Sequence, residues 1–256
     1  MKEILTGIVH RIEQAILRAG LDAGETVRDV RVGLRYTAVA FAEGAGVAYS
    51  VTDAPCHSCV QFSGRRPLAG KPAGELLGFL DSIHPTEVAV GLAAVNALAN
   101  RPRDELTEGD VLEFISLDRS DDVAMVGHFG PLVAPLRERV RSLRILERVE
   151  KPQGDLLPVQ DAPRVLGESH IALITSSSIV NHSLDELLSA AGNCREVVLL
   201  GASTPLLPEA FEGTAVTCLS GVVVAEAAEI LRVVSEAGGM RQFSRFIRKV
   251  NLPLRR

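Results

Sequence analysis

The spacing of apolar residues changes several times along the first hundred positions. Residues 4–19 carry isoleucines and alanines at helical spacing, whereas residues 27–51 alternate β-branched or aromatic positions with polar ones. These patterns predict a helix followed by a short antiparallel meander. Two more helices are predicted at 73–81 and 85–100, the second with a proline just inside its start. The first part of the chain is therefore expected to form a compact α+β unit.

Beyond residue 121, short apolar runs alternate with amphipathic segments at the spacing of βαβ units. The predicted strands are 122–126, 143–148, 171–175, 196–200 and 215–219. The predicted helices are 131–142, 183–191, 205–211 and 224–238. This alternation favours a parallel sheet with helices on both faces.

A highly charged stretch at 101–121, with a short helix predicted at 110–115, separates the two patterns. The predicted fold class is therefore α/β with two domains, a small α+β domain over residues 1–105 and a Rossmann-like domain over residues 106–256. The tail from Arg241 to Arg256 contains basic residues and no acidic one. It is interpreted as a solvated helix face, with a patch for an acidic partner as the alternative.

Composition narrows the function classes. The chain has 256 residues, of which 27 are Lys or Arg and 32 are Asp or Glu, and the resulting net charge of -5 argues against nucleic acid as a partner. We find no run of about 18 apolar residues, so no membrane partner is expected. The 4 cysteines are too few for a disulfide scaffold, which favours a cytoplasmic location. The oligomeric state stays open, with a homodimer as one option.

Polar turns follow the predicted strands directly. Three such turns are Gly127–Pro131, Thr175–Ser178 and Gly201–Pro205, and Ser220-Gly221 is a fourth after the next strand. In a parallel sheet all of them meet at the carboxyl edge, where open α/β folds bind ligands. The predicted contacts to a small-molecule ligand are Gly127, Phe129, Thr175, Ser176, Ser177, Asn181, Gly201, Ser203, Thr204, Ser220 and Gly221. Thr204 is also expected to cap a helix that starts at Pro205.

Glu147 ends the second strand of this series, twenty positions after Gly127. A carboxylate at that place binds a pair of ribose hydroxyls in dinucleotide-binding folds. The alternative is a structural role, in which Glu147 caps the end of the strand through a salt bridge. The turn Gly127–Pro131 lacks the GxGxxG of dinucleotide enzymes and the glycine triplet of methyltransferases, so a nucleotide-like ligand is one option among others.

Three further groups of residues are candidates for chemistry. Cys56 and Cys59 have the spacing of half a metal site, although no second CxxC follows and a plain loop is the alternative. Glu87 and His128 are the candidate acid–base groups. Asn96, set among alanines and leucines, is expected either to contact the ligand or to join its helix to the neighbouring domain.

Several of these segments resemble one known family in the same order. The matching stretches are 82–98, 123–132, 145–147, 174–181, 184–188, 201–205 and 219–221. They are similar to a prokaryotic family of unknown function labelled "putative heavy-metal chelation", in which an enolase-amino-terminal-like domain precedes the Rossmann-like one. The resemblance implies a role in metal homeostasis and a small polar or anionic ligand in a cleft between the domains. Pterin-, flavin- or siderophore-like chelators are the expected ligand classes.

Three functions follow as hypotheses. The first is an enzyme of chelator metabolism, of a condensing, hydrolytic or transfer type. The second is a non-catalytic carrier or sensor of a metal or a metal–chelate complex. The third is an enzyme that depends on a nucleotide or on adenosylmethionine. The cofactor is unknown, with a metal ion or a nucleotide-like molecule as the options.

Overall fold

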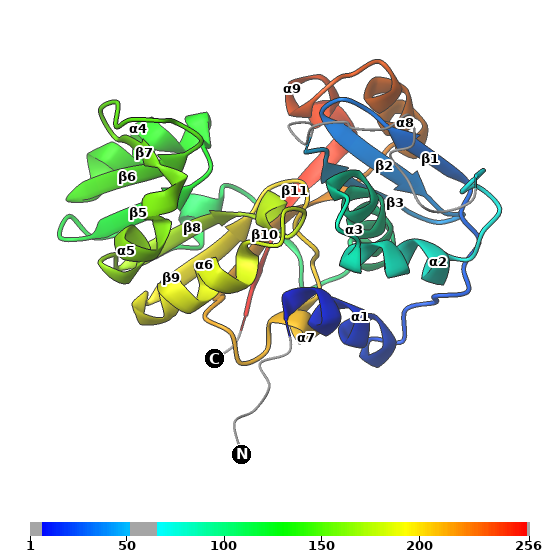
Figure 1. The fold of residues 1–256 in the computed structure, drawn as a ribbon, viewed down its shortest axis with the longest axis horizontal. Helices are drawn as coiled ribbons and strands as arrows, with labels where there is room; N and C mark the ends of the chain where they lie inside the picture. Colours follow the sequence, from blue (N-terminus) through cyan, green and yellow to red (C-terminus); the bar gives the residue numbers. More distant parts are fainter. Residues whose placement is uncertain (1–6, 52–65, 255–256) are drawn as a thin grey trace.

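The computed structural model describes residues 7–51 and 66–254, which form two sheets (Figure 1). The smaller sheet has three antiparallel strands in the order β1-β2-β3. The larger one has eight strands in the order β4-β11-β10-β9-β8-β5-β6-β7 and is mostly parallel. The predicted α/β fold class is confirmed. Within these ranges we find no helix with the length and apolar character needed to span a membrane.

The first part of the chain folds as its periodicity predicts. Its elements are α1 (Ile8–Arg18), β1 (Asp29–Val32), β2 (Tyr36–Ala40), β3 (Ala45–Tyr49), α2 (Ala73–Leu77), the 3-10 helix η1 (Gly78–Asp81) and α3 (Pro85–Ala99). Every residue of α3 from Glu87 to Ala99 is buried. This helix packs against β2 and β3 on one side and against α2 and η1 on the other. Its small residues suit such a position, because they let backbones approach closely from both sides.

The second part alternates strands and helices. It begins with β4 (Thr107–Glu108), η2 (Val111–Glu113), β5 (Asp122–Val126), α4 (Gly130–Arg139), β6 (Ser142–Glu147), β7 (Leu156–Pro158), η3 (Val159–Asp161) and α5 (Ala162–Gly167). It continues with β8 (Ile171–Thr175), η4 (Ser176–Ser178), α6 (Leu184–Ala190), η5 (Ala191–Asn193), β9 (Glu196–Leu200) and α7 (Pro208–Phe211). It ends with β10 (Cys218–Val224), α8 (Ala227–Ser235), α9 (Met240–Phe243), η6 (Ser244–Phe246) and β11 (Ile247–Pro253).

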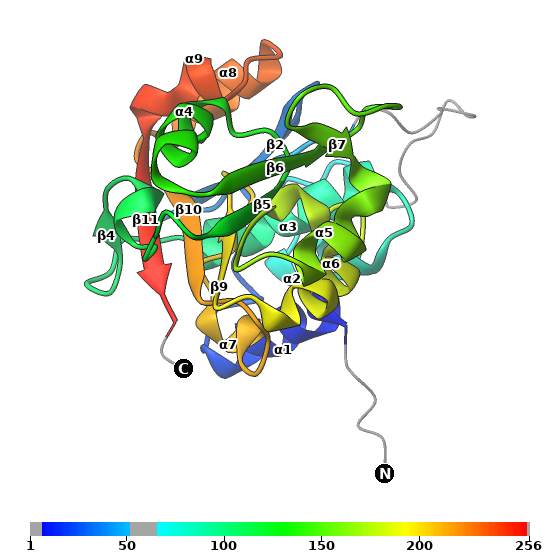
Figure 2. The same ribbon diagram turned by 90° about the vertical axis from the view of Figure 1, so that its left-hand side faces the viewer.

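The six parallel strands have the Rossmann order. In the spatial order β7-β6-β5-β8-β9-β10 they have the strand order 3-2-1-4-5-6. Successive strands are added on one side of β5 and then, from β8 onward, on its other side, which places the switch point between β5 and β8. Helices α5 and α6 cover one face of this sheet, and α4 lies on the other (Figure 2). Both faces are buried, as the near-continuous apolar strands require: Ala124 packs in one cluster, whereas Val123 and Met125 pack in the other.

Five features of the second part differ from the prediction. Strand β7 and helix α5 were not predicted, because residues 150–168 carry many charged and proline residues. Strand β10 starts later and runs longer than 215–219, and α7 begins only at Pro208. Most of the basic tail is not a helix face. Arg241 lies in the short helix α9, but Ile247–Pro253 is strand β11, antiparallel to β10. Its charged residues Arg248 and Lys249 are exposed while Val250, Asn251 and Leu252 are buried, so charge concealed the strand pattern.

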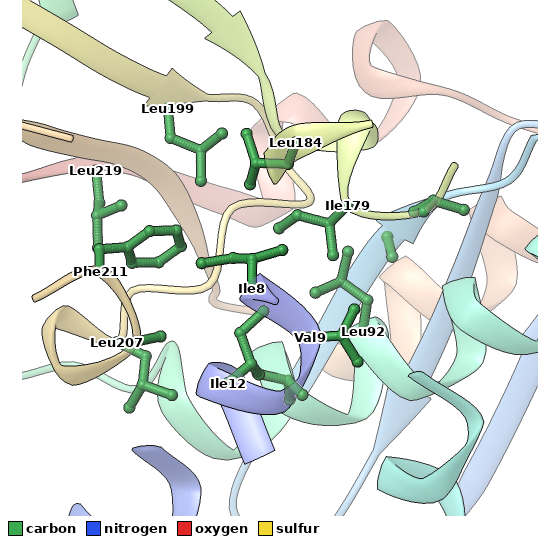
Figure 3. Packing of buried hydrophobic residues seen from close by; sticks show 14 of the residues in the cluster. Ile8, Val9, Ile12, Leu92, Ile179, Leu184, Leu199, Leu207, Phe211 and Leu219 are labelled. Atoms are coloured by element: carbon green, nitrogen blue, oxygen red, sulfur yellow. The ribbon is translucent and has the colours of Figure 1, made fainter. Parts of the chain in front are cut away.

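The two parts share their cores. Helix α1 packs on α7, where Ile8, Val9 and Ile12 lie among apolar side chains of the large sheet and its loops (Figure 3). The Asp185 carboxylate of α6 accepts the Ile8 N–H at 2.9 Å and so supplies a cap for α1. At the other end of the molecule, α8 lies against β1 and β2 (Figure 1). The boundary between residues 105 and 106 remains a prediction.

Candidate ligand site at the carboxyl edge of the large sheet

A pocket of about 790 Å³ lies at the carboxyl ends of the parallel strands. Its walls are formed mainly by the segments that follow β5, β6, β7, β8 and β9. Tyr36 of β2, Tyr49 of β3 and Val51, just after β3, complete the lining from the smaller sheet. The pocket therefore straddles the switch point between β5 and β8, which is where open α/β sheets bind ligands. Its volume is in the range of small-molecule sites.

Most of the residues predicted from the polar turns line this pocket. They are Gly127, His128, Phe129, Glu147, Thr175, Ser176, Ser177, Asn181, Gly201 and Ser203. Five other predicted residues are not in its lining: Glu87, Asn96, Thr204, Ser220 and Gly221. The structure thus brings the strand-end residues together, and their contact with a ligand remains a prediction.

Two glycines shape the floor of the pocket. Gly127 directly follows β5 and has φ +87°, and Gly201 directly follows β9 and has φ +121°. Such values are strained for residues with a side chain. A Cβ at Gly127 would lie 3.6 Å from the Phe129 ring, and a Cβ at Gly201 would lie 3.9 Å from the same ring. The Phe129 ring therefore lies against both turns, across the ends of β5 and β9.

The Glu147 carboxylate is oriented by backbone amides. Its Oε2 accepts the His128 N–H at 3.1 Å, and its Oε1 accepts the Arg148 N–H at 2.9 Å. Each carboxylate oxygen can accept more than one hydrogen bond, so both keep capacity for a ligand. These two hydrogen bonds fix the direction of the Glu147 carboxylate.

The turn after β8 is a network of hydroxyls. Thr175 caps η4, and its Oγ1 lies 2.9 Å from the Ser177 Oγ. The Ser178 Oγ donates to the Thr175 carbonyl at 2.6 Å. The Ser176 Oγ differs from these: it is buried and has no hydrogen-bond partner among the described residues. An unpaired buried hydroxyl costs about 1–3 kcal/mol, so a partner supplied by a ligand would stabilise this turn.

The wall opposite the sheet is aromatic. The Tyr36 and Tyr49 rings meet edge to face, with centroids 5.6 Å apart. Burial, with a smaller effect of Tyr49, raises the pKa of the Tyr36 phenol to about 12. The Ser203 Oγ accepts the Tyr49 N–H at 2.8 Å, which fastens this wall to the loop after β9. Tyr36 therefore presents a neutral ring to the pocket.

Comparison with known protein families shows to which family the chain belongs. Residues 110–253 match the family described as "putative heavy-metal chelation" (DUF364), and residues 12–99 match a second family (DUF4213) with the same description. The first match alone covers more than half of the chain. The chain belongs to the DUF364 family. The family resemblance seen in the sequence is thereby confirmed, while the likeness of the first domain to the enolase amino-terminal domain remains a prediction.

Relatives and solved structures agree with this assignment. An uncharacterized protein of Methanocaldococcus jannaschii is 27% identical over 154 residues, which is 59% of this chain and 60% of that protein. The match thus spans less than two thirds of that relative. A DUF364 protein of unknown function from Pyrococcus horikoshii superposes with a TM-score of 0.84 at 26% identity, over 96% of this chain and 100% of that one. A second, from Desulfitobacterium hafniense DCB-2, has a TM-score of 0.77 at 26% identity, over 98% and 99%.

The described residues of this DUF364 chain do not form a metal site. Cys56 and Cys59 lie outside the described residues. Cys194 and Cys218 are buried apart from the pocket, and burial raises the pKa of each thiol to about 11. Both act as small apolar residues of the core. In residues 7–51 and 66–254 no group of three or more His, Cys, Asp and Glu side chains is close enough to hold a metal ion.

The candidates on α3 point elsewhere. Glu87 is 1% exposed and accepts a hydrogen bond from the Ser82 hydroxyl. Asn96 donates to the Val47 carbonyl at 2.8 Å, so it binds β3 of its own domain. The residue that joins α3 to the large sheet is Asn100, four positions later. Its amide donates to the Thr204 and Val222 carbonyls and accepts the Leu206 N–H.

The predictions for Thr204 and for Ser220-Gly221 are wrong in their local structure. Thr204 lies in a buried loop before α7, whose N-cap is Leu207, so the predicted helix cap is wrong. Ser220 and Gly221 lie inside β10 and not after it. A Cβ at Gly221 would lie 3.1 Å from the Thr204 carbonyl, so this glycine allows the loop to approach the strand.

Some residues of the pocket were missed. Tyr36 and Tyr49 come from the other sheet, and Glu186, an exposed residue at the start of α6, also lines the pocket. The strand pattern identifies the tyrosines as strand residues but carries no information on which strand ends face the second domain. Their wall could have been found only by knowing how the two parts pack.

Proposed function

We propose that this protein is an enzyme that binds a small polar chelator, or a precursor of one, in the pocket between the two sheets. The observation that carries the proposal is the buried Ser176 hydroxyl, which lines the pocket without a partner among the described residues. Hydroxyls and backbone amides are the groups with which proteins recognise polar organic ligands. The aromatic wall of Tyr36 and Tyr49 suits a planar ligand ring.

The character of the site supports an organic ligand rather than a bare ion. Three of its polar side chains, Thr175, Ser176 and Ser177, are neutral hydroxyls. Soft metal ions prefer thiolate and imidazole ligands. In the proposal the metal is therefore carried by donor atoms of the bound chelator, and the protein contributes shape and hydrogen bonds.

His128 is the residue to which we assign proton transfer. It lies in the pocket lining on the turn after β5 and is exposed. Imidazole changes its charge near neutral pH, which suits an acid–base role. Glu87 is buried under Ser82, away from this lining, and takes no part in the proposal.

The test measures binding of three probes that represent the ligand classes: neopterin, riboflavin and 2,3-dihydroxybenzoate. Titration calorimetry compares the wild type with Ser176→Ala and with Ser235→Ala, an exposed serine of α8 outside the pocket. We expect at least one probe to bind and Ser176→Ala to weaken it by about tenfold, because a buried hydrogen bond to the ligand is lost. Equal affinities in all three proteins would contradict the proposal.

The carrier hypothesis makes a different prediction. A carrier that holds metal through Cys56 and Cys59 would lose bound metal in the Cys56→Ser/Cys59→Ser double variant while its affinity for the probes stayed unchanged. Metal content measured by plasma mass spectrometry separates the two hypotheses. Turnover of a bound probe, with a loss in His128→Asn, supports the enzyme.

A further inference from the structure

The pocket is long enough for two different ligands. Glu147 ends β6 and Gly201 ends β9, and β5 and β8 lie between these strands. Adjacent strands are about 4.8 Å apart, so three spacings separate the two ends by roughly 14 Å. This distance exceeds the width of a single aromatic ring system, and the side chains at the two ends also differ in chemistry.

The end at β6 combines one fixed carboxylate with apolar walls. The two carboxylate oxygens of Glu147 are held by the amides of His128 and Arg148. Beside them, the segment that follows β7 contributes Val159, Ala162 and Pro163 to the lining. A bidentate acceptor next to an apolar slot fits a vicinal diol attached to a planar base. This is the arrangement that holds the ribose and base in Rossmann folds.

The centre of the edge does not fit a pyrophosphate. Dinucleotides place that group against the backbone of the first glycine turn. Here the Phe129 ring lies against the turns at Gly127 and Gly201, at the distances given above. The turn's own amides are also used, since Gly127 donates to the Leu146 carbonyl at 2.9 Å and His128 donates to Glu147. A ligand with a bulky anion at this point would have to displace the ring.

We infer that the end of the pocket around Glu147 is a subsite for a single ribonucleoside whose 5′ substituent is not a pyrophosphate. Glu147 accepts its 2′ and 3′ hydroxyls, and Phe129 excludes dinucleotides. The end near Ser176 and Tyr49 then holds the second substrate, and this part of the inference rests on the proposed function. The protein is thus a two-substrate enzyme whose cosubstrate is a nucleoside such as adenosylmethionine.

The test is a set of titrations with the full chain. The probes are adenosylmethionine, adenosine, 2′-deoxyadenosine, 3′-deoxyadenosine and NAD⁺. We expect adenosine and adenosylmethionine to bind at least tenfold more tightly than NAD⁺, and both deoxyadenosines to bind several-fold more weakly than adenosine. Glu147→Gln should weaken adenosine about tenfold. Glu138→Gln, an exposed glutamate of α4 outside the lining, is the matched control and should change nothing.

Substitution of Phe129 should produce a gain of binding instead of a loss. Phe129→Ala and the milder Phe129→Leu should strengthen NAD⁺ binding relative to the wild type and retain adenosine binding, which also shows that the variants are folded. Wild-type NAD⁺ affinity equal to that of adenosine would overturn the inference. So would equal binding of adenosine and its deoxy forms, or no nucleoside binding up to about 1 mM.

The outcome also separates this inference from the proposed function. Lumichrome has a flavin-like ring but no vicinal hydroxyls, so its binding should stay within about twofold in Glu147→Gln and fall in Ser176→Ala. If adenosine binds while neopterin, riboflavin and 2,3-dihydroxybenzoate do not, the nucleoside subsite stands and the proposed function fails. If one of those three binds while no nucleoside does, the subsite fails alone.

Discussion

Tyr36 joins the pocket wall to the core of the smaller sheet. Its ring lies edge to face against Tyr49 on one side and against Phe243 of α9 on the other, with centroids 5.6 Å and 4.9 Å apart. Removal of its phenol from water raises its pKa to about 12. The side chain therefore stays neutral in the folded protein at pH values where it ionises in the unfolded chain.

This shift predicts a loss of stability at alkaline pH. Between the ordinary pKa of 10.0 and the raised value of about 12, the unfolded state releases a proton that the folded state keeps. Stability then falls as pH rises through this window and is fully present below it. Thermal unfolding from pH 8 to pH 11.5 should show a steeper fall of Tm in the wild type than in Tyr36→Phe, which keeps the ring. Parallel curves for the two proteins would contradict the assignment.

At the scale of single residues, the sequence was informative about the strand ends. Gly127, Glu147 and Thr175 could be assigned to one site because the carboxyl ends of parallel strands share an edge. The unpaired state of Ser176 could not be predicted, since it depends on which segments pack around its hydroxyl. One of them is the turn after β9, where a Cβ added at Gly201 would lie 3.1 Å from the Ser176 hydroxyl. Patterns along one segment do not contain such contacts between segments.

Helix α3 and strand β3 pack closely against each other. Gly46 of β3 faces α3 so closely that a Cβ there would overlap the backbone of Ala93 and Ala97. Backbone atoms cannot move aside as a side chain can. The contact explains why α3 is buried on all sides and why an isolated glycine stands in a strand pattern.

Gly46→Ala should therefore be strongly destabilising. We expect a loss of at least about 3 kcal/mol in the free energy of unfolding, because the overlap forces the two elements apart. The control is Gly78→Ala in η1, where a Cβ meets nothing within 4 Å and the backbone is helical. It should be neutral or stabilising by about 0.5–1 kcal/mol. Similar urea midpoints for both variants would show that the packing of α3 on β3 is looser than described.

At the scale of elements, periodicity predicted the parallel strands better than the edges of the sheet. Strands β5, β8 and β9 appear as predicted, because strands buried on both faces are continuous apolar runs. Strand β11 escaped prediction, since Arg248 and Lys249 stand among its buried residues. Strand β7 was not predicted either, because its 3 residues are too few to show a hydrophobic alternation.

The molecule as a whole is held together by contacts that cross its two parts. Helix α1 packs on α7, α8 packs on β1 and β2, and Asn100 spans the junction between α3 and the large sheet. Asn100 is 3% exposed and satisfies three backbone groups of the large-sheet part. Since the pocket takes walls from both parts, this junction also fixes the shape of the site.

Asn100→Ala should lower the stability of both parts together. We expect a loss of about 3–5 kcal/mol, because several buried backbone groups lose their partners. Urea unfolding is followed by tyrosine fluorescence, which reports the smaller sheet that holds Tyr36 and Tyr49, and by circular dichroism, which reports the whole chain. The two midpoints should shift equally, and exposed Asn193→Ala should shift neither. A shift confined to one probe would mean that the parts unfold independently.

The central claim is that the pocket at the switch point holds a small organic ligand through hydroxyl and carboxylate contacts. Mass spectrometry of the molecules released from the purified protein tests it most directly, with the Ser176→Ala/Glu147→Gln double variant purified in parallel. We expect a hydroxyl-bearing small molecule that accompanies the wild type and is depleted from the folded variant. A ligand retained equally by both proteins would contradict it.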